Sequence, residues 1–222
     1  PRVQGLQPAA ASRRFPSYLA PAMTQLPELP LTLSRQEIRK MIRQRRRALT
    51  PEQQQEMGQQ AATRMMTYPP VVMAHTVAVF LSFDGELDTQ PLIEQLWRAG
   101  KRVYLPVLHP FSAGNLLFLN YHPQSELVMN RLKIHEPKLD VRDVLPLSRL
   151  DVLITPLVAF DEYGQRLGMG GGFYDRTLQN WQHYKTQPVG YAHDCQLVEK
   201  LPVEEWDIPL PAVVTPSKVW EW

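Results

Sequence analysis

The stretch Arg166-Leu-Gly-Met-Gly-Gly-Gly-Phe-Tyr-Asp-Arg176 contains four glycines within five consecutive positions. The apolar, β-branched run at 152–160 precedes it and predicts a buried strand. Residues 174–181 follow it and predict a helix. A strand, a glycine-rich turn and a helix in this order leave backbone N–H groups free to bind an anion. The stretch therefore predicts a phosphate-binding loop in an α/β fold.

The residue types in this loop suit a phosphate group. Glycines allow positive φ, and they let phosphate oxygens approach the main chain without a Cβ in the way. Asp175 lies where a carboxylate could meet a phosphate-bound Mg²⁺, and Arg166 and Arg176 add positive charge. The spacing matches neither the G-x-x-x-x-G-K-[ST] loop nor the dinucleotide G-x-G-x-x-G loop. The alternative is an ordinary tight connection, although one glycine would suffice for that.

Length and composition limit the classes of protein to which the chain can belong. A chain of 222 residues with 44% hydrophobic and 21% charged residues can bury the core of one α/β domain. No run approaches the roughly 20 apolar residues that a membrane span needs. Cys195 is the only cysteine, which suits a reducing cytosol. Residues 1–22 lack sustained periodicity and an apolar signal-peptide core, so we expect a disordered N-terminal extension before a domain at 23–222.

Two capping boxes predict neighbouring helices, one opening at Ser34-Arg-Gln-Glu37 and the other at Thr50-Pro-Glu-Gln53. The first helix carries an unusual number of arginines. Their spacing of three and four residues places several of them on one helix face. Such a face meets solvent, an acidic neighbour or an anion, and composition alone leaves all three open. The arginines on this face are Arg35, Arg39, Arg43 and Arg46.

Short apolar runs predict further strands at 77–82, 101–107, 116–119 and 189–192. Glu86 follows the first of these runs, beyond the carboxyl end of the strand, where ligands bind in open α/β sheets. The sequence His193-Asp194-Cys195 resembles a catalytic triad only by composition. Successive side chains of a strand point to opposite faces, so these three do not converge on one point. We therefore assign no catalysis to them.

The wider run Ala159-Phe-Asp-Glu-Tyr-Gly-Gln-Arg-Leu-Gly-Met-Gly-Gly-Gly-Phe-Tyr-Asp175 closely resembles the signature of the 5-formyltetrahydrofolate cyclo-ligase family. The resemblance extends in separate blocks from about Ser34 to Thr215. It departs from the family pattern at Phe173, where Tyr is more usual, and at Arg35, where Lys is more usual. Glu136 matches an acid of the family whose binding or structural role the sequence does not separate.

This resemblance implies an open, mostly parallel Rossmann-like sheet flanked by helices in a single domain. It implies conversion of 5-formyltetrahydrofolate, a reduced folate, and ATP into 5,10-methenyltetrahydrofolate, ADP and phosphate. It assigns catalytic roles to Arg166 and Tyr174, and Mg²⁺ binding to Asp175 and Asp207. The folate contacts it implies are Glu86, Met169 and Phe173. The ATP contacts it implies are Arg35, Arg39, Arg166, Leu167, Gly168, Met169, Gly170, Gly171, Gly172, Phe173 and Tyr174.

Two other classes of function remain open. A sugar-phosphate isomerase or acyl transferase on a related fold would use the glycine loop without ATP or Mg²⁺. A nucleic-acid-binding module would use the arginine-rich helix, but the formal net charge of +2 does not demand such a partner. We expect a cytoplasmic monomer that binds neither nucleic acid nor a membrane.

Overall fold

The computed structural model describes residues 33–222, so the predicted extension at 1–22 lies outside the described residues. Ser34 caps the first helix, and its side chain accepts a hydrogen bond from the Glu37 N–H. Thr50 and Gln53 form the reciprocal capping box predicted for the second helix. The helices are α1 (Arg35–Arg47), α2 (Pro51–Thr67), α3 (Pro69–Met73), α4 (Gln90–Arg98) and α5 (Phe173–Leu178), with short 3-10 turns η2 (Val141–Asp143), η3 (Leu147–Arg149), η4 (Trp181–His183) and η5 (Asp194–Gln196).

The main sheet has eight strands in the order β13-β12-β10-β7-β1-β2-β3-β6. Its five inner strands are parallel, and the antiparallel strands β13, β3 and β6 lie toward its two edges. The mostly parallel α/β sheet predicted from the sequence is thus confirmed. The strands are β1 (Thr76–Ala78), β2 (Arg102–Leu108), β3 (Leu116–Tyr121), β6 (Val144–Leu145), β7 (Val152–Thr155), β10 (Gln187–Tyr191), β12 (Ala212–Val214) and β13 (Val219–Glu221).

The order of the parallel strands creates a point where the chain changes direction across the sheet. Numbered along the chain, these strands run 2-1-3-4-5, and the reversal falls between β1 and β7. Open α/β sheets bind ligands in the crevice beyond the carboxyl ends of the strands at such a switch point. The segments that leave β1 and β7 therefore border the expected binding region.

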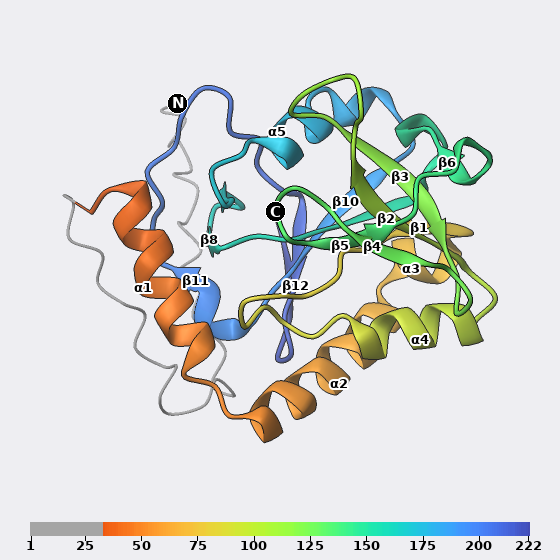
Figure 1. Ribbon diagram of the computed structural model, residues 1–222. Helices are drawn as coiled ribbons and strands as arrows, with labels where there is room; N and C mark the ends of the chain where they lie inside the picture. Colours follow the sequence, from red (N-terminus) through yellow and green to blue (C-terminus); the bar gives the residue numbers. More distant parts are fainter. Residues whose placement is uncertain (1–32) are drawn as a thin grey trace, which may run out of the picture.

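Apolar side chains cover both faces of the main sheet, as expected for a parallel sheet. Along β1, Val77 packs toward α2 and α4, whereas the next residue, Ala78, packs toward the α5 side. Figure 1 shows α2 and α4 on one side of the sheet and α5 on the other. Each face therefore has its own cluster of buried apolar residues.

A second, three-stranded sheet in the order β11-β8-β9 lies between the main sheet and α1. Its strands are β8 (Ala159–Asp161), β9 (Arg166–Leu167) and β11 (Leu197–Val198). Ile38 and Ile42 of α1 pack on Ala159, Leu167 and Val198 of this sheet. The apolar stripe of the arginine-rich helix is thereby buried, while its other faces stay available for polar contacts. A separate hairpin joins β4 (Leu127–Met129) to β5 (His135–Pro137).

Two elements around the glycine stretch differ from their predictions. The run at 152–160 is not one strand, because Pro156 has no N–H for a sheet ladder and the chain turns there from β7 into the small sheet. The glycine stretch consequently follows β9 instead of a strand of the main sheet. The helix predicted at 174–181 ends at Leu178, and Asn180 adopts a left-handed φ of 61°.

The first strand of the sheet is also shorter than predicted. The sequence predicted a strand at 77–82, but β1 ends at Ala78. Beyond it the Val79 N–H still donates to the Tyr104 carbonyl at 2.9 Å, after which the chain leaves the sheet. This early departure frees residues 81–89 to form the loop that carries Glu86.

Candidate functional site

Arg166 occupies the switch point between β1 and β7. Its Nε donates to the carbonyl oxygen of Pro156, the residue after β7, at 2.9 Å. Its Nη1 lies 3.8 Å from Asp175 Oδ1, and its guanidinium stands 5.5 Å from the centre of the Tyr174 ring. Burial lowers the pKa of Arg166, while the nearby Asp175 and Tyr174 raise it. A buried cation is therefore held where ligands enter this class of sheet.

The glycine loop presents its carbonyl groups to arginines. Arg39 Nε donates to the Gly168 carbonyl at 2.7 Å, and the Arg176 guanidinium donates to the Gly171 carbonyl. Gly170 and Gly172 have φ of 108° and 69°, a region that glycine adopts at little cost. Because arginines from α1 and α5 flank the loop, a phosphate bound here would meet cations on both sides.

Arg176 also joins the glycine loop to the β2–β3 hairpin, since its Nε donates to the Gly114 carbonyl at 2.6 Å. The sequence indicated only that this arginine adds charge beside the loop. Its actual partners are the carbonyl group of Gly171, on the adjacent loop, and that of Gly114, 62 residues away in the chain. Arg176 thus holds the loop through contacts that do not involve α1.

Asp175 and Asp207 lie in one region, although their present partners differ. Asp175 Oδ1 accepts a hydrogen bond from the Ile208 N–H at 3.1 Å, which brings the two acidic segments together. Asp207 forms a two-point ion pair with Arg35, at 2.5 and 3.1 Å, and also accepts from the Glu204 N–H. Arg35 thus neutralises Asp207, whereas the nearest cation to Asp175 is the more distant Arg166.

Glu86 is buried beyond the end of β1, with only 9% of its surface exposed. Its Oε1 accepts a hydrogen bond from the Phe83 N–H at 3.1 Å. Burial raises the pKa of Glu86 to about 7, and this effect outweighs the opposing influence of Arg46 and Arg166. Glu86 is therefore not a solvated loop acid but a carboxyl group that titrates near neutral pH.

Tyr174 completes the group of side chains around Arg166. Its hydroxyl is buried and has no hydrogen-bond partner within the described residues. Burial raises its pKa, with Arg166 and Glu86 as the charged groups that influence it. An unpaired buried hydroxyl costs free energy unless a ligand or water satisfies it. The fold thus brings Arg166 and Glu86 close to the Tyr174 hydroxyl, which lacks a hydrogen-bond partner in the described part of the chain.

The remaining predicted contacts surround this group. Met169 is 49% exposed and Phe173 is half-buried, so both can meet a ligand.

Glu136 holds the fold together, because its Oε2 accepts from the Leu108 N–H at 3.1 Å and from the Asn130 side chain at 3.0 Å. These contacts give Glu136 a structural role that the sequence left open.

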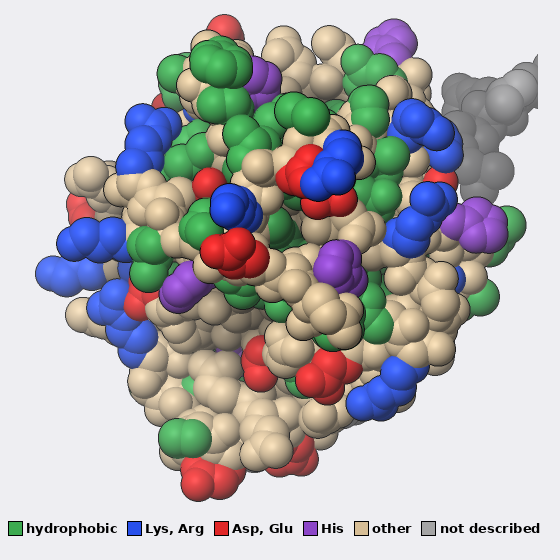
Figure 2. Space-filling model, turned by 45° about the vertical axis from the view of Figure 1, so that its right-hand side comes forward, with side chains coloured by type: hydrophobic (Ala, Val, Ile, Leu, Met, Phe, Trp, Pro, Cys, Tyr) green, Lys and Arg blue, Asp and Glu red, His purple; other side chains and the backbone are tan. Residues whose placement is uncertain are grey.

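Several arginines of the arginine-rich helix pair with groups on other segments of the protein. Arg35 and Arg39 contact Asp207 and the glycine loop, and the arginines near its carboxyl end approach Asp84. On the face in Figure 2, Lys and Arg are interspersed with Asp and Glu instead of forming one basic surface. The contacts of α1 within the protein therefore favour a role in the site over a nucleic-acid-binding role.

The geometry around His193 agrees with the absence of a triad. His193 is buried, its Nε2 lies 3.2 Å from the Gly85 carbonyl, and its pKa is lowered to about 4, mainly by burial. Burial raises the pKa of Cys195 to about 11, so its thiol is not activated. Asp194 contacts the Ser217 hydroxyl instead of His193.

Three further features of residues 33–222 concern metal binding, membranes and a surface groove. No group of three or more His, Cys, Asp or Glu side chains in this range is arranged to hold a metal ion. No helix in the same range is long and apolar enough to cross a membrane. A groove lined by Gln59, Gln60, Thr63, Arg64, Pro216 and Ser217 shares no residue with the candidate site.

Several known proteins are similar to this chain in sequence or in structure. A model of the 5-formyltetrahydrofolate cyclo-ligase family matches residues 32–216. The 5-formyltetrahydrofolate cyclo-ligase of Haemophilus influenzae is 53% identical over 179 residues, covering 81% of this chain and 96% of that protein. The enzyme of the same name from Mycolicibacterium smegmatis is 31% identical over 188 residues, covering 83% and 95%. The solved structure of Aquifex aeolicus 5,10-methenyltetrahydrofolate synthetase matches with a TM-score of 0.73 and 28% identity, covering 85% of this chain and 93% of that one.

Proposed function

The chain belongs to the 5-formyltetrahydrofolate cyclo-ligase family, and from this we propose that it converts 5-formyltetrahydrofolate and ATP into 5,10-methenyltetrahydrofolate, ADP and phosphate. The observation that carries the proposal is the convergence of Arg166, Tyr174 and Glu86 beside the glycine loop. Phosphate-binding and folate-binding groups would then meet at one point of the sheet.

The chemistry explains why the site needs positioned charges and no covalent nucleophile. A formamide oxygen is a poor leaving group, so the γ-phosphoryl group of ATP is first transferred to it. N10 of the folate then attacks the activated formyl carbon, and phosphate leaves as the ring closes. Phosphoryl transfer depends mainly on positioning and on neutralising charge. Arg166 would stabilise the charge that develops on the transferred group, and the Tyr174 hydroxyl would donate to it.

The glycine loop and α1 would hold the nucleotide. Backbone N–H groups at 168–172 would face phosphate oxygens, because the carbonyls of Gly168 and Gly171 are already directed at Arg39 and Arg176. Arg35 and Arg39 would offset the phosphate charge. Met169 and Phe173, on the same loop, would line the adjoining folate pocket.

The acidic residues of the site suit a magnesium ion that is bound largely by ATP. Mg²⁺ in such sites takes one or two carboxylates and completes its shell with water and phosphate oxygens. Asp175 is the primary ligand that we propose, and Asp207 is the second. Because Asp207 is paired with Arg35, Arg35 would have to leave Asp207 and turn to the phosphates for Asp207 to hold the metal.

Glu86 would recognise the folate. A carboxylate at this position can accept hydrogen bonds from the exocyclic amine and a ring N–H of the pterin. Its burial keeps water from competing for those bonds, which strengthens them.

The deciding experiment is a turnover assay with 5-formyltetrahydrofolate and Mg·ATP, in which the methenyl product is followed by its absorbance. Reactions without ATP, and with a non-hydrolysable ATP analogue, serve as controls. We expect product only in the complete reaction, together with stoichiometric ADP. Product formed equally well without ATP, or none from a folded and nucleotide-binding protein, would contradict the proposal.

A further inference from the structure

Three arginines from the carboxyl half of α1 form ion pairs with Asp84. Arg47 Nη2 lies 2.5 Å from Asp84 Oδ1, and Arg47 Nε donates to the same oxygen at 2.6 Å. Arg46 Nη2 and Arg43 Nε approach the other oxygen, Oδ2, at 3.6 and 3.7 Å. The Arg46 side chain is almost completely buried, so this cluster is more than a solvated surface pair.

The backbone at Asp84 and Gly85 is unusual and is held from several sides. Both residues have left-handed φ, 53° and 75°. The Gly85 carbonyl accepts from Gln54 Nε2 at 3.1 Å and lies 3.2 Å from His193 Nε2. A Cβ added at Gly85 would lie 3.2 Å from the backbone of Arg46. The turn is therefore docked tightly against the carboxyl end of α1.

This turn places Glu86, the next residue along the chain. The Glu86 N–H donates to the Phe83 carbonyl at 3.1 Å, while the Glu86 carboxyl group accepts from the Phe83 N–H at the same distance. Residues 83–86 thus form one closed unit. A shift of Asp84 relative to α1 would move the Glu86 carboxyl group with it.

The same helix also contacts the nucleotide side of the site. Arg39 binds the Gly168 carbonyl, and Arg35 binds Asp207. With a rise of about 1.5 Å per residue, the backbone of α1 spans about 18 Å between its first and last residues. One rigid element therefore carries both the anchor of the glycine loop and the anchor of the turn before Glu86.

We propose that Asp84 is a positioning residue, whose ion pairs with Arg43, Arg46 and Arg47 fix the Glu86 carboxyl group relative to the glycine loop and thereby set the affinity for the folate. The inference rests on the proposed function, because it assumes that Glu86 contacts the folate. It assigns the carboxyl half of the arginine-rich helix to folate recognition. The amino half of the helix keeps its proposed role in nucleotide binding.

The charges around Glu86 provide a second readout, which is the pH dependence of folate binding. Arg46 on α1 and Arg166 on β9 lower the pKa of Glu86, whereas Asp84 on its own loop raises it. Tyr174 on α5 and the His193 ring are the other titratable groups that face it. Removing the Asp84 charge should therefore shift the midpoint of pH-dependent folate binding to lower pH.

The test is a double-mutant cycle on dissociation constants for 5-formyltetrahydrofolate and for ATP. The proteins are wild type, D84N, E86Q and the double variant D84N/E86Q. We expect D84N to weaken folate binding about tenfold and to leave ATP binding within about twofold. In the E86Q background, D84N should cause little further loss, because Asp84 acts through Glu86.

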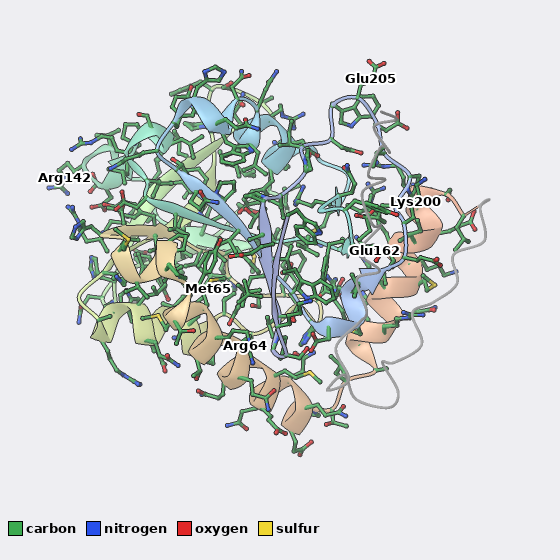
Figure 3. The ribbon with its side chains drawn as sticks, turned by 180° about the vertical axis from the view of Figure 1, so that it is seen from behind. Arg64, Met65, Arg142, Glu162, Lys200 and Glu205 are labelled. Atoms are coloured by element: carbon green, nitrogen blue, oxygen red, sulfur yellow. The ribbon has the colours of Figure 1, made fainter. Side chains whose placement is uncertain are left out.

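The matched control is D140N. Asp140 also pairs with an arginine, Arg142, at 2.7 Å, and Figure 3 shows Arg142 at the edge of the molecule opposite α1. This variant should leave both dissociation constants unchanged. If D84N does not fold, R47Q removes the shortest of the three ion pairs at an exposed position and should show the same non-additivity with E86Q.

The outcomes separate this inference from the proposed function. Failure of the wild-type protein to bind 5-formyltetrahydrofolate would refute the proposed function itself. If wild type binds and E86Q binds weakly, but D84N and R47Q bind normally, only the role of Asp84 is overturned. Additive losses in the double variant, or an unshifted pH midpoint in D84N, would also overturn it.

Discussion

At the scale of single residues, Glu86 shows the largest conflict between folding and the proposed function. Its carboxyl group is buried, yet the proposed folate contact requires it to be ionised. Burial raises its pKa to about 7 because the charged form loses its hydration. The protein thus holds the pKa of this carboxyl group near neutral pH, so a modest change in its environment changes its charge.

Substitution of Glu86 tests its assignment to the folate. E86Q replaces one acceptor with an amide donor that would face the donors of the pterin, so folate binding should weaken about tenfold to a hundredfold. ATP binding should barely change. Calorimetric dissociation constants for both ligands provide the measurement, and E126Q at an exposed position is the control. A loss of ATP affinity with normal folate affinity would place Glu86 in the nucleotide or metal site.

The pH dependence of folate binding follows from the same residue. The ionised form of Glu86 is the one that accepts two hydrogen bonds, and it becomes dominant as the pH rises through about 7. Wild-type affinity for 5-formyltetrahydrofolate should therefore increase from pH 6 to pH 8. The E86Q variant should lack this increase in titrations at matched ionic strength. An equally steep rise in both proteins would assign the titration to another group.

Glu86 should also make the stability of the protein depend on pH. Its pKa is higher in the folded state than the ordinary value of 4.5, so the protonated group favours folding below that pH. This contribution is lost as the pH rises through about 7. Between pH 5 and 9, wild type should lose up to about 3 kcal/mol of unfolding free energy relative to E86Q. Urea unfolding of both proteins measures the difference, and parallel pH profiles would contradict the prediction.

At the scale of elements, the glycine loop depends more on its own backbone than on the helix that follows it. Helix α5 has only six residues, so its dipole is short and contributes little to anion binding. Positive φ at Gly170 and Gly172, together with the carbonyl contacts to Arg39 and Arg176, defines the loop instead. The arginines supply the charge that a longer helix would have supplied.

Substitution of Gly170 tests this view of the loop. G170A should lose most of its ATP affinity, because alanine strains the φ of 108° and its Cβ would occupy space that the phosphate oxygens need. G100A is the matched control, since Gly100 also has positive φ and a Cβ there would have open space. Both variants should lose similar stability, on the order of 1 kcal/mol. Normal ATP binding by a folded G170A protein would show that the loop does not hold phosphate.

At the scale of the whole molecule, the site forms where three separate packing arrangements meet. The main sheet supplies the switch point between β1 and β7, and the small sheet supplies Arg166 through β9. Helix α1 lies at one side of the molecule (Figure 1), and its Arg39 donates a hydrogen bond to the Gly168 carbonyl of the glycine loop. Ligands that bridge these parts should therefore stabilise the entire domain.

Binding of Mg·ATP should raise the melting temperature. At a hundred times its dissociation constant, a ligand that binds only the folded state adds about 2.7 kcal/mol of stability. Excess chelator should remove the metal-dependent share of this gain, and D175N should lack that share from the outset. Scanning calorimetry with ATP, Mg·ATP and ATP plus chelator measures these contributions. An equal gain from ATP in chelator would contradict the role of Asp175.

The sequence by itself determined the α/β class, the glycine loop, the two capped helices and the position of Glu86 beyond a strand. These features depend on short-range backbone chemistry, which a few neighbouring residues specify. The tertiary structure alone decided the 2-1-3-4-5 order and the partners of each arginine. Arg35 and Asp207, for example, are 172 residues apart in the chain. The same arginine pattern fits solvent, an acid or an anion, and only the packing of α1 on remote segments selects among them.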